Sequence, residues 1–193
     1  MGKGRLEAFT DGVMAIIITI MVLELRVPDG ADLETLRPLA PVLVSYLLSF
    51  VFIGIYWNNH HHMMHAVKTV NGPALWANLH LLFWLSLIPF VTRWMGGNRF
   101  APWPVALYGV VLLFSGVAYF MLSRVLVAHH GKGSELAEAL GGDLKGKLSI
   151  VIYLVAVPFS FVDSWVAYAM FILVALIWLV PDRRFERIAD KNE

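Results

Sequence analysis

The feature of this sequence that most limits its fold is a succession of long apolar stretches separated by short polar breaks. A helix that crosses the hydrocarbon core of a bilayer needs about 20 mostly apolar residues. Hydrophobic residues make up 59% of the 193 residues and charged residues only 15%, whereas soluble domains hold about 45–50% apolar residues. We therefore predict an all-α integral membrane protein with six transmembrane helices, at residues 6–27, 39–57, 75–95, 104–127, 148–162 and 165–180.

The last two stretches could also form one long helix, because only Asp163 and Ser164 separate them. Lysine and arginine concentrate on the cytoplasmic side of membrane proteins. With six helices, the side that holds both termini receives eleven of the 15 Lys and Arg residues, and the other side receives Arg26, Arg37, Arg93 and Arg99. Merging the two stretches would give seven against eight, which is no bias. Six helices with both termini in the cytoplasm is therefore the better interpretation.

Composition narrows the classes of function. The net charge is +1, and no basic patch with interleaved aromatic residues indicates a nucleic-acid partner. The chain has no cysteine, which excludes disulfides, thiol chemistry and iron–sulfur clusters. Glu7 and Asp11 interrupt the N-terminal apolar stretch, so we interpret that stretch as a retained helix rather than a signal peptide.

The first stretch keeps Arg5, Thr10 and Asp11 near its start and then carries no charge until Glu24. An ionised aspartate at the edge of hydrocarbon is unfavourable by a few kcal/mol unless it has a partner or a function. At about 100° per residue, Asp11 lies about 140° from an apolar stripe on this helix. Such stripes usually face lipid or pack against other helices, and Arg5 and Asp11 could be a topology signal and an ion pair. The members of the stripe are Phe9, Ile16, Thr19, Ile20, Leu23 and Val27.

Several short motifs give this stretch a more specific interpretation. Arg5-x-x-x-Phe9-Thr10-Asp11, followed by Ala15-Ile16-Ile17-Ile18-Thr19-Ile20 and Leu23, resembles the first-helix signature of the prokaryotic homologues of the lysosomal potassium channel, transmembrane protein 175. Thr10 stands where the family pattern has serine, and it keeps the hydroxyl. The similarity extends to Trp57-x-x-His60-His61, to Asn78-Leu79, to Pro89-Phe90 and to the six-span layout.

The resemblance implies a single six-helix channel domain over residues 1–193, assembled as a homotetramer in the cell membrane. Such a channel would pass K⁺ in preference to Na⁺, with no catalytic residue, metal or cofactor. The first helix would line the pore and form a hydrophobic gate, and the matching positions are those that the helical wheel groups independently: Ile16, Thr19, Ile20 and Leu23. No Thr-Val-Gly-Tyr-Gly motif is present, so a carbonyl filter of that kind is not expected.

The remaining motif residues are interpreted as a structural signature: Arg5, Phe9, Thr10, Asp11, Trp57, His60, His61 and Asn78. Because Asp11 lies opposite the apolar stripe, we expect it to point back into its own subunit. Its expected partner is Arg5, a histidine of the cluster at residues 60–65, Trp57 or Asn78.

The histidine cluster at residues 60–65 leaves two other classes of function open. His61 and His65 are spaced i, i+4, which places two imidazoles on one helix face and would suit a metal-dependent membrane enzyme. A proton- or cation-coupled secondary transporter could instead use Asp11 and this cluster as a proton relay. Metal-dependent membrane enzymes need several such clusters, and here no acidic residue lies near the only one.

We therefore expect purified protein to carry no stoichiometric iron or zinc. Elemental analysis of the protein checks this prediction. One or two metal ions per subunit would instead favour the enzyme.

Overall fold

The computed structural model describes residues 2–131, 133–134, 136–137, 141 and 143–179. Within them the chain folds into helices, and the one strand-like feature is an isolated bridge between Gly2 and Thr69. The helices are α1 Gly4–Leu23, the 3₁₀ helix η1 Leu33–Leu39, α2 Ala40–His65, α3 Gly72–Ser86, α4 Ile88–Gly97, α5 Pro102–His130, α7 Leu144–Phe159 and α8 Ser164–Leu179. The predicted end of the last span at Val180 and the cations that follow it lie outside the described residues.

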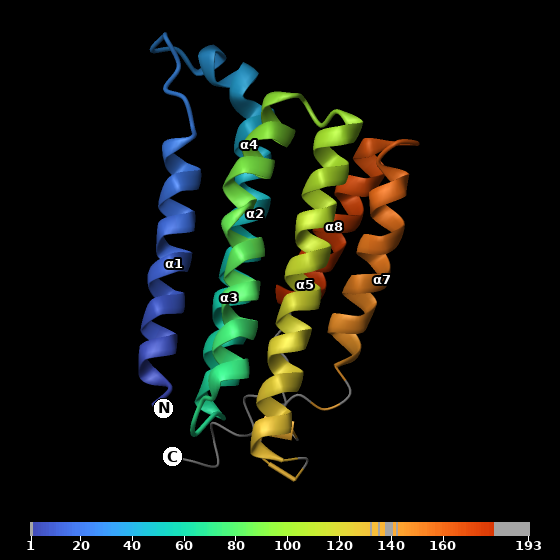
Figure 1. Cartoon of the computed structure of the whole chain (residues 1–193). Coiled ribbons are helices and arrows are strands. Elements are labelled where there is room, and N and C mark those ends of the chain that lie inside the picture. The colour runs from blue at the N-terminus through green and yellow to red at the C-terminus, as the bar shows by residue number, and fades with distance from the viewer. Residues whose placement is uncertain (1, 132, 135, 138–140, 142, 180–193) are drawn as a thin grey trace.

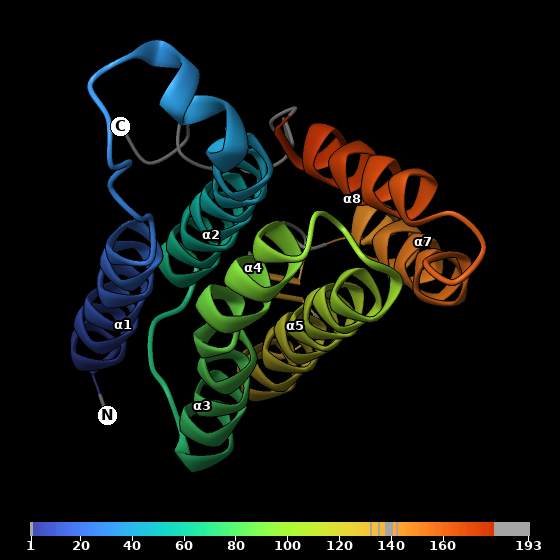
Figure 2. The same cartoon turned by 90° about the horizontal axis from the view of Figure 1, so that it is seen from above.

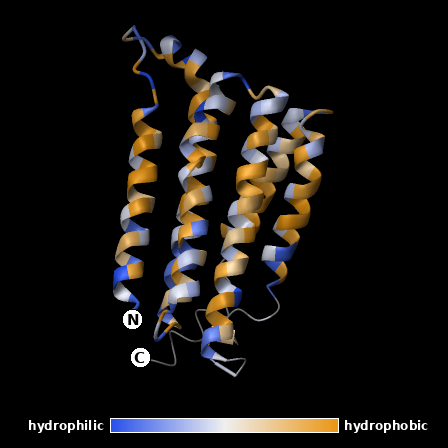
Figure 3. Cartoon of the chain, in the orientation of Figure 1, coloured by the Kyte–Doolittle hydropathy of each residue, from blue (hydrophilic) through white to orange (hydrophobic). Residues whose placement is uncertain are grey.

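Each predicted span corresponds to helix, since a backbone in an apolar environment must satisfy its own N–H and C=O groups. Four segments are long and apolar enough to cross a membrane, namely Gly4–Leu23, Leu33–His65, Gly72–Gly97 and Pro102–His130. The other two, α7 and α8, have 16 residues each. Figure 3 shows the apolar residues in the middle of the helices and polar residues gathered toward the ends.

The predicted span over residues 75–95 lies within one membrane-length segment, Gly72–Gly97, and the structure adds that a break at Leu87 divides this segment into α3 and α4. Pro89 lacks a backbone N–H and its ring clashes with the carbonyl of the residue four positions earlier. The break lets Leu87 N–H donate to the Trp84 carbonyl at 3.2 Å instead of continuing the α-helical pattern.

Most helix bounds differ from the prediction by a few residues, and two of these differences bear on the site. The first helix ends at Leu23 rather than Val27, and the residue that follows it, Glu24, forms an ion pair with Arg93. The second helix runs on to His65, well past the predicted end at Trp57. Hydropathy marks where a helix leaves hydrocarbon and not where it ends, so the polar run that contains the histidines was excluded from the predicted span.

The last two spans are separate helices, as predicted. Asp163 lies in the turn between them, where its Oδ1 accepts hydrogen bonds from the backbone N–H groups of Trp165 at 2.9 Å and Val166 at 3.3 Å. A carboxylate in this position satisfies N–H groups that the first turn of a helix leaves free. Asp163 therefore caps the start of α8, which packs against α7.

The helices form a bundle in which α5 is central and α1 lies at one edge (Figures 1 and 2). α5 packs against α3, α4, α7 and α8, whereas α1 packs against α2, α3 and α4. The apolar core between them includes Phe52, Leu81, Ile88, Leu112 and Phe171. One side of α1 is therefore covered by its own subunit and the other is not.

The crossing of α2 and α4 depends on close approach and on polar contacts. An added Cβ at Gly96 would lie 2.3 Å from Ser45 Oγ and 2.8 Å from Val42 Cα, so only glycine fits there. Nearby, the buried hydroxyl of Ser49 lies 2.7 Å from Thr92 Oγ1 and 3.0 Å from Tyr108 Oη. These contacts join α2, α4 and α5 inside the bundle, where no water is available to solvate the hydroxyl groups.

We predict that Gly96→Ala destabilises the subunit by about 1–3 kcal/mol, because the added methyl group overpacks the α2–α4 crossing. Gly97→Ala is the matched control, since an added Cβ at Gly97 meets nothing within 4 Å. Thermal unfolding of the purified protein in detergent measures the difference. Equal unfolding temperatures for the two variants would contradict the close approach.

Candidate pore-lining helix and its anchoring network

Helix α1 has one packed side and one bare side. Its buried residues are Leu6, Thr10, Met14, Ile17 and Met21, a spacing of three and four that follows one face of a helix. Three residues of the predicted stripe lie on the other side: Ile16 is 58% exposed, Ile20 is 42% exposed and Leu23 is 80% exposed. Branched apolar side chains on an uncovered face need lipid or another protein chain to cover them.

Thr19 lies on the same bare side. Its hydroxyl donates a hydrogen bond to the Ile16 carbonyl at 2.8 Å. Because that bond uses its only hydrogen, the hydroxyl oxygen can act toward any other group only as an acceptor. Val22, which the helical wheel places off the stripe, is also 47% exposed, so the bare side is wider than the stripe.

Thr10 is the start of a buried chain of hydrogen bonds that crosses three helices. Asn78 Nδ2 of α3 donates to Thr10 Oγ1 of α1 at 2.8 Å, and His60 Nε2 of α2 lies 3.0 Å from Asn78 Oδ1. The three side chains are at most 2% exposed. Since the Asn78 oxygen is an acceptor, the geometry requires the hydrogen on His60 Nε2.

Asp11 pairs with Trp57, one of its four expected partners. Trp57 Nε1 donates to Asp11 Oδ1 at 3.1 Å, and both residues are exposed on the subunit. The His61 ring stacks on Trp57 with 5.8 Å between centroids and 17° between planes. Trp57 of α2 is thereby held in place by Asp11 of α1 and by His61, one turn further along α2. His60, which is among the other expected partners of Asp11, forms its hydrogen bond with Asn78 instead.

Arg5 and Phe9 lie on the flank of α1 that faces α3. Together with Leu75 and Leu79 they line a shallow pocket between the two helices. Arg5 and Asp11 are both exposed and form no ion pair with each other, which disagrees with the alternative of a buried pair. Six residues along a helix separate them by about 240°, so the two side chains diverge.

His61 and His65 meet at the end of α2, with 3.0 Å between their Nε2 atoms. Among the described residues, no group of three or more His, Cys, Asp or Glu side chains could hold a metal ion.

Sequence analysis missed the contacts that hold the two ends of α1. At one end Lys3 Nζ donates to the Met64 carbonyl at 2.7 Å, in the last turn of α2. At the other end Glu24 is paired with Arg93 of α4. The only sequence signal for either contact is a charge next to an apolar stretch, which does not identify a partner.

Comparison with known proteins assigns the chain to a family. A family model described as the endosomal/lysosomal potassium channel TMEM175 matches residues 5–89. A protein named potassium channel from Chryseobacterium sp. (strain P1-3) is 52% identical over 192 residues, which cover 100% of both chains. A protein named potassium channel from Chamaesiphon minutus (strain ATCC 27169 / PCC 6605) is 28% identical over 185 residues, or 90% of this chain and 91% of that one.

A solved structure has the same fold. It is described as a crystal structure of a lysosomal potassium-selective channel TMEM175 homolog from Chamaesiphon minutus, and it matches with a TM-score of 0.78 at 26% identity. The match covers 92% of this chain and 96% of that one. With this fold, and with a relative 52% identical over its full length, the chain belongs to the TMEM175 family of ion channels.

Proposed function

We propose that this protein is a potassium-permeable channel of the cell membrane that prefers K⁺ to Na⁺. In this proposal four copies of the single domain, residues 1–193, surround a pore lined by α1, with both termini in the cytoplasm. The observation that carries the proposal is the bare apolar side of α1, with Ile16, Ile20 and Leu23 exposed while the opposite side is packed. Two relatives named potassium channel support the choice of ion.

The proposed gate consists of rings of apolar side chains. Ile16 and Ile20 are four residues apart and Ile20 and Leu23 are three apart, so the rings would lie about 6 Å and about 4.5 Å apart along the pore. Branched apolar rings provide no ligand for an ion and can close a pore by excluding water. Thr19, between the rings, would present its oxygen lone pairs to a passing cation.

The proposed basis of selectivity is dehydration. In a narrow apolar neck an ion must shed part of its water, and K⁺ holds its water less tightly than Na⁺. Selectivity of this kind needs no carbonyl filter, in agreement with the absence of such a motif in the sequence.

The proposed role of the signature residues is to fix the position and rotation of α1. Thr10, Asn78 and His60 tie it to α3 and α2 inside the bundle, and Asp11 with Trp57 does so at the surface. Arg5, Phe9 and His61 flank these contacts. Because a rotation of α1 would remove Ile16 from the pore axis, these residues would act on conduction through α1 rather than by touching ions.

Currents through purified protein in lipid bilayers test the proposal directly. A channel gives currents that follow the K⁺ gradient and reverse near the K⁺ equilibrium potential in mixed K⁺ and Na⁺ solutions. A secondary transporter that uses Asp11 and the histidine cluster would instead show saturating flux coupled to protons or to a second cation.

We predict that Ile16→Asn raises conductance and shifts the reversal potential toward that of a non-selective pore, because the amide wets the apolar neck. Leu23→Ala should raise conductance with a smaller loss of selectivity, since it widens the pore without adding a polar group. Val22→Asn is the matched control, because it places the same amide at an exposed position off the stripe. The gate assignment fails if Ile16→Asn currents equal the parent's in size and reversal potential.

A second prediction concerns Asp11. Asp11→Ala removes the acceptor of the Trp57 N–H and should weaken assembly by about 0.5–1.5 kcal/mol per subunit. Asp11→Asn keeps an oxygen in the same place and should weaken it less. The tetramer fraction in size-exclusion chromatography measures assembly, and reversal potentials measure ion preference. A full tetramer yield with changed selectivity would show that Asp11 contacts ions.

A further inference from the structure

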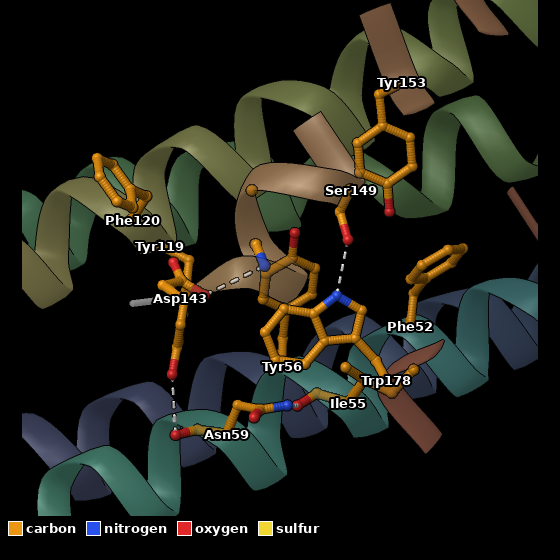
Figure 4. A pocket seen from close by; sticks show the side chains of 12 residues that line it. Phe52, Ile55, Tyr56, Asn59, Tyr119, Phe120, Asp143, Ser149, Tyr153 and Trp178 are labelled. Atoms are coloured by element: carbon orange, nitrogen blue, oxygen red, sulfur yellow. Dashed lines mark hydrogen bonds between the residues drawn. The ribbon is translucent and has the colours of Figure 1, made fainter. Parts of the chain in front are cut away.

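A cavity lies between α2, α5, α7 and α8, and no residue of α1 lines it. Figure 2 shows how these four helices lie relative to α1. It offers about 40 Å³ to the centres of water-sized molecules. A single water needs about 10–15 Å³ on this measure, so the cavity has room for about three waters or for an organic group of similar size. Its wall is mainly aromatic, and Figure 4 shows the rings around it: Phe52, Tyr56, Tyr119, Phe120, Tyr153 and Trp178.

The charge in the wall is negative. Asp143, the residue before α7, is the one Asp, Glu, Lys or Arg among the described residues that line the cavity. Its Oδ1 accepts a hydrogen bond from the Gly146 N–H at 3.1 Å, and among the described residues no donor forms a hydrogen bond with its other oxygen. Lys145 and Lys147 lie on the same first turn but do not line the cavity.

Two tyrosine hydroxyls in the wall have no hydrogen-bond partner in the described part of the chain, those of Tyr56 and Tyr153. The other polar groups are used within the protein: Tyr119 Oη donates to the Asn59 carbonyl at 3.1 Å, and Trp178 Nε1 donates to Ser149 Oγ at 2.9 Å. No enclosed polar side-chain atom of the described residues lacks a partner. The hydroxyls of Tyr56 and Tyr153 therefore face accessible space, and the cavity is the space that they share (Figure 4).

We propose that this cavity binds a small organic ammonium group. The faces of aromatic rings attract cations, and quaternary and primary ammonium groups are recognised by such rings. The Asp143 carboxylate supplies a counter-charge, and the oxygen atoms of Tyr56 and Tyr153 accept N–H hydrogen bonds. Among the described residues that line the cavity no side chain is cationic to bind an anion; Arg124, whose Cζ lies 5.2 Å from the Phe120 centroid, is not one of them. A purely apolar group would leave both hydroxyls unpaired.

The position of Asp143 gives two sources of such a group. It is the N-cap of α7, at the end of that helix which in the proposed topology faces the cytoplasm. A free amine could reach the cavity from water, and the ethanolamine headgroup of a phospholipid could reach it from the membrane surface. Both present the same ammonium chemistry.

The test is thermal unfolding of the purified full chain in detergent, with ethylammonium chloride as the ligand. Ethanol has the same number of non-hydrogen atoms without the charge, and sodium chloride keeps the ionic strength equal. We expect ethylammonium, and not ethanol, to raise the unfolding temperature in a saturable manner. Equal effects of the two compounds, or no effect of either, would overturn the proposal and leave a water-filled cavity.

Two variants test whether ethylammonium binds in this cavity. Asp143→Asn keeps an oxygen for the Gly146 N–H but removes the charge, and it should weaken ethylammonium binding about tenfold. Tyr56→Phe removes only a hydroxyl and should weaken binding severalfold, which keeps the test informative if Asp143→Asn does not fold. Unchanged binding in both variants would place ethylammonium elsewhere, such as in the pore, and would contradict the proposal.

Filling the cavity gives an independent check. Gly116→Ala adds a methyl group 3.8 Å from the Tyr56 hydroxyl oxygen, which is an ordinary contact that takes up part of the space. It should weaken ethylammonium binding without destabilising the protein. Gly54→Ala on α2 is the matched control, because an added Cβ there meets nothing within 4 Å. Equal binding to the two variants would contradict this location.

Lipid composition separates the two sources. In nanodiscs of phosphatidylglycerol, which has no ammonium group, ethylammonium should bind as in detergent. If the lipid headgroup is the natural occupant, phosphatidylethanolamine will compete and raise the apparent dissociation constant for the parent but not for Asp143→Asn. The same constant in both lipids assigns the cavity to a free amine.

Discussion

The hydrogen-bonded chain from Thr10 through Asn78 to His60 is the interaction on which the arrangement of α1 depends. α1 lies at the edge of the bundle, and its buried side offers mainly flexible apolar side chains that would pack in several rotations. Within a membrane, a buried amide or hydroxyl without a partner is strongly unfavourable. The hydrogen bonds from Thr10 through Asn78 to His60 therefore permit one rotation of α1. That rotation leaves Ile16, Ile20 and Leu23 uncovered.

The polar anchors of α1 lie at its two ends and in its first half. Lys3 binds the end of α2, Asp11 binds Trp57, and Glu24 binds Arg93 of α4. Three charged residues thus hold the two ends and the first half of the helix. The segment from Gly12 to Leu23 holds only apolar side chains and Thr19, so polar anchoring is confined to the regions outside the proposed gate. This division separates the residues that position the helix from those proposed to meet the ion.

Hydropathy was sufficient to place the six spans, because burial in lipid selects for apolar residues along a known length. It could not locate the break at Leu87, where one proline in an apolar run decides the local structure, nor the continuation of α2 through the histidines. The family motif pointed to Thr10, Asn78 and His60 as a set. Their pairing, and the contact of Asp11 with Trp57, depend on how three helices rotate against one another. When every face of a helix is apolar, sequence periodicity carries little information about that rotation. For the same reason the sequence does not predict the cavity lined by Tyr56 and Tyr153.

The length of α7 links this protein to the thickness of its membrane. α7 has 16 residues and carries Lys145 and Lys147 in its first turn. The apolar part that follows spans about 18 Å at 1.5 Å per residue, against a hydrocarbon core of about 30 Å. In the proposed six-span arrangement, the bilayer next to α7 would therefore thin, or the lysine side chains would reach outward to the headgroups, and each ångström of mismatch would carry a modest energetic penalty. A membrane thickened by sterols or longer acyl chains increases the mismatch along this flank of the bundle, far from α1.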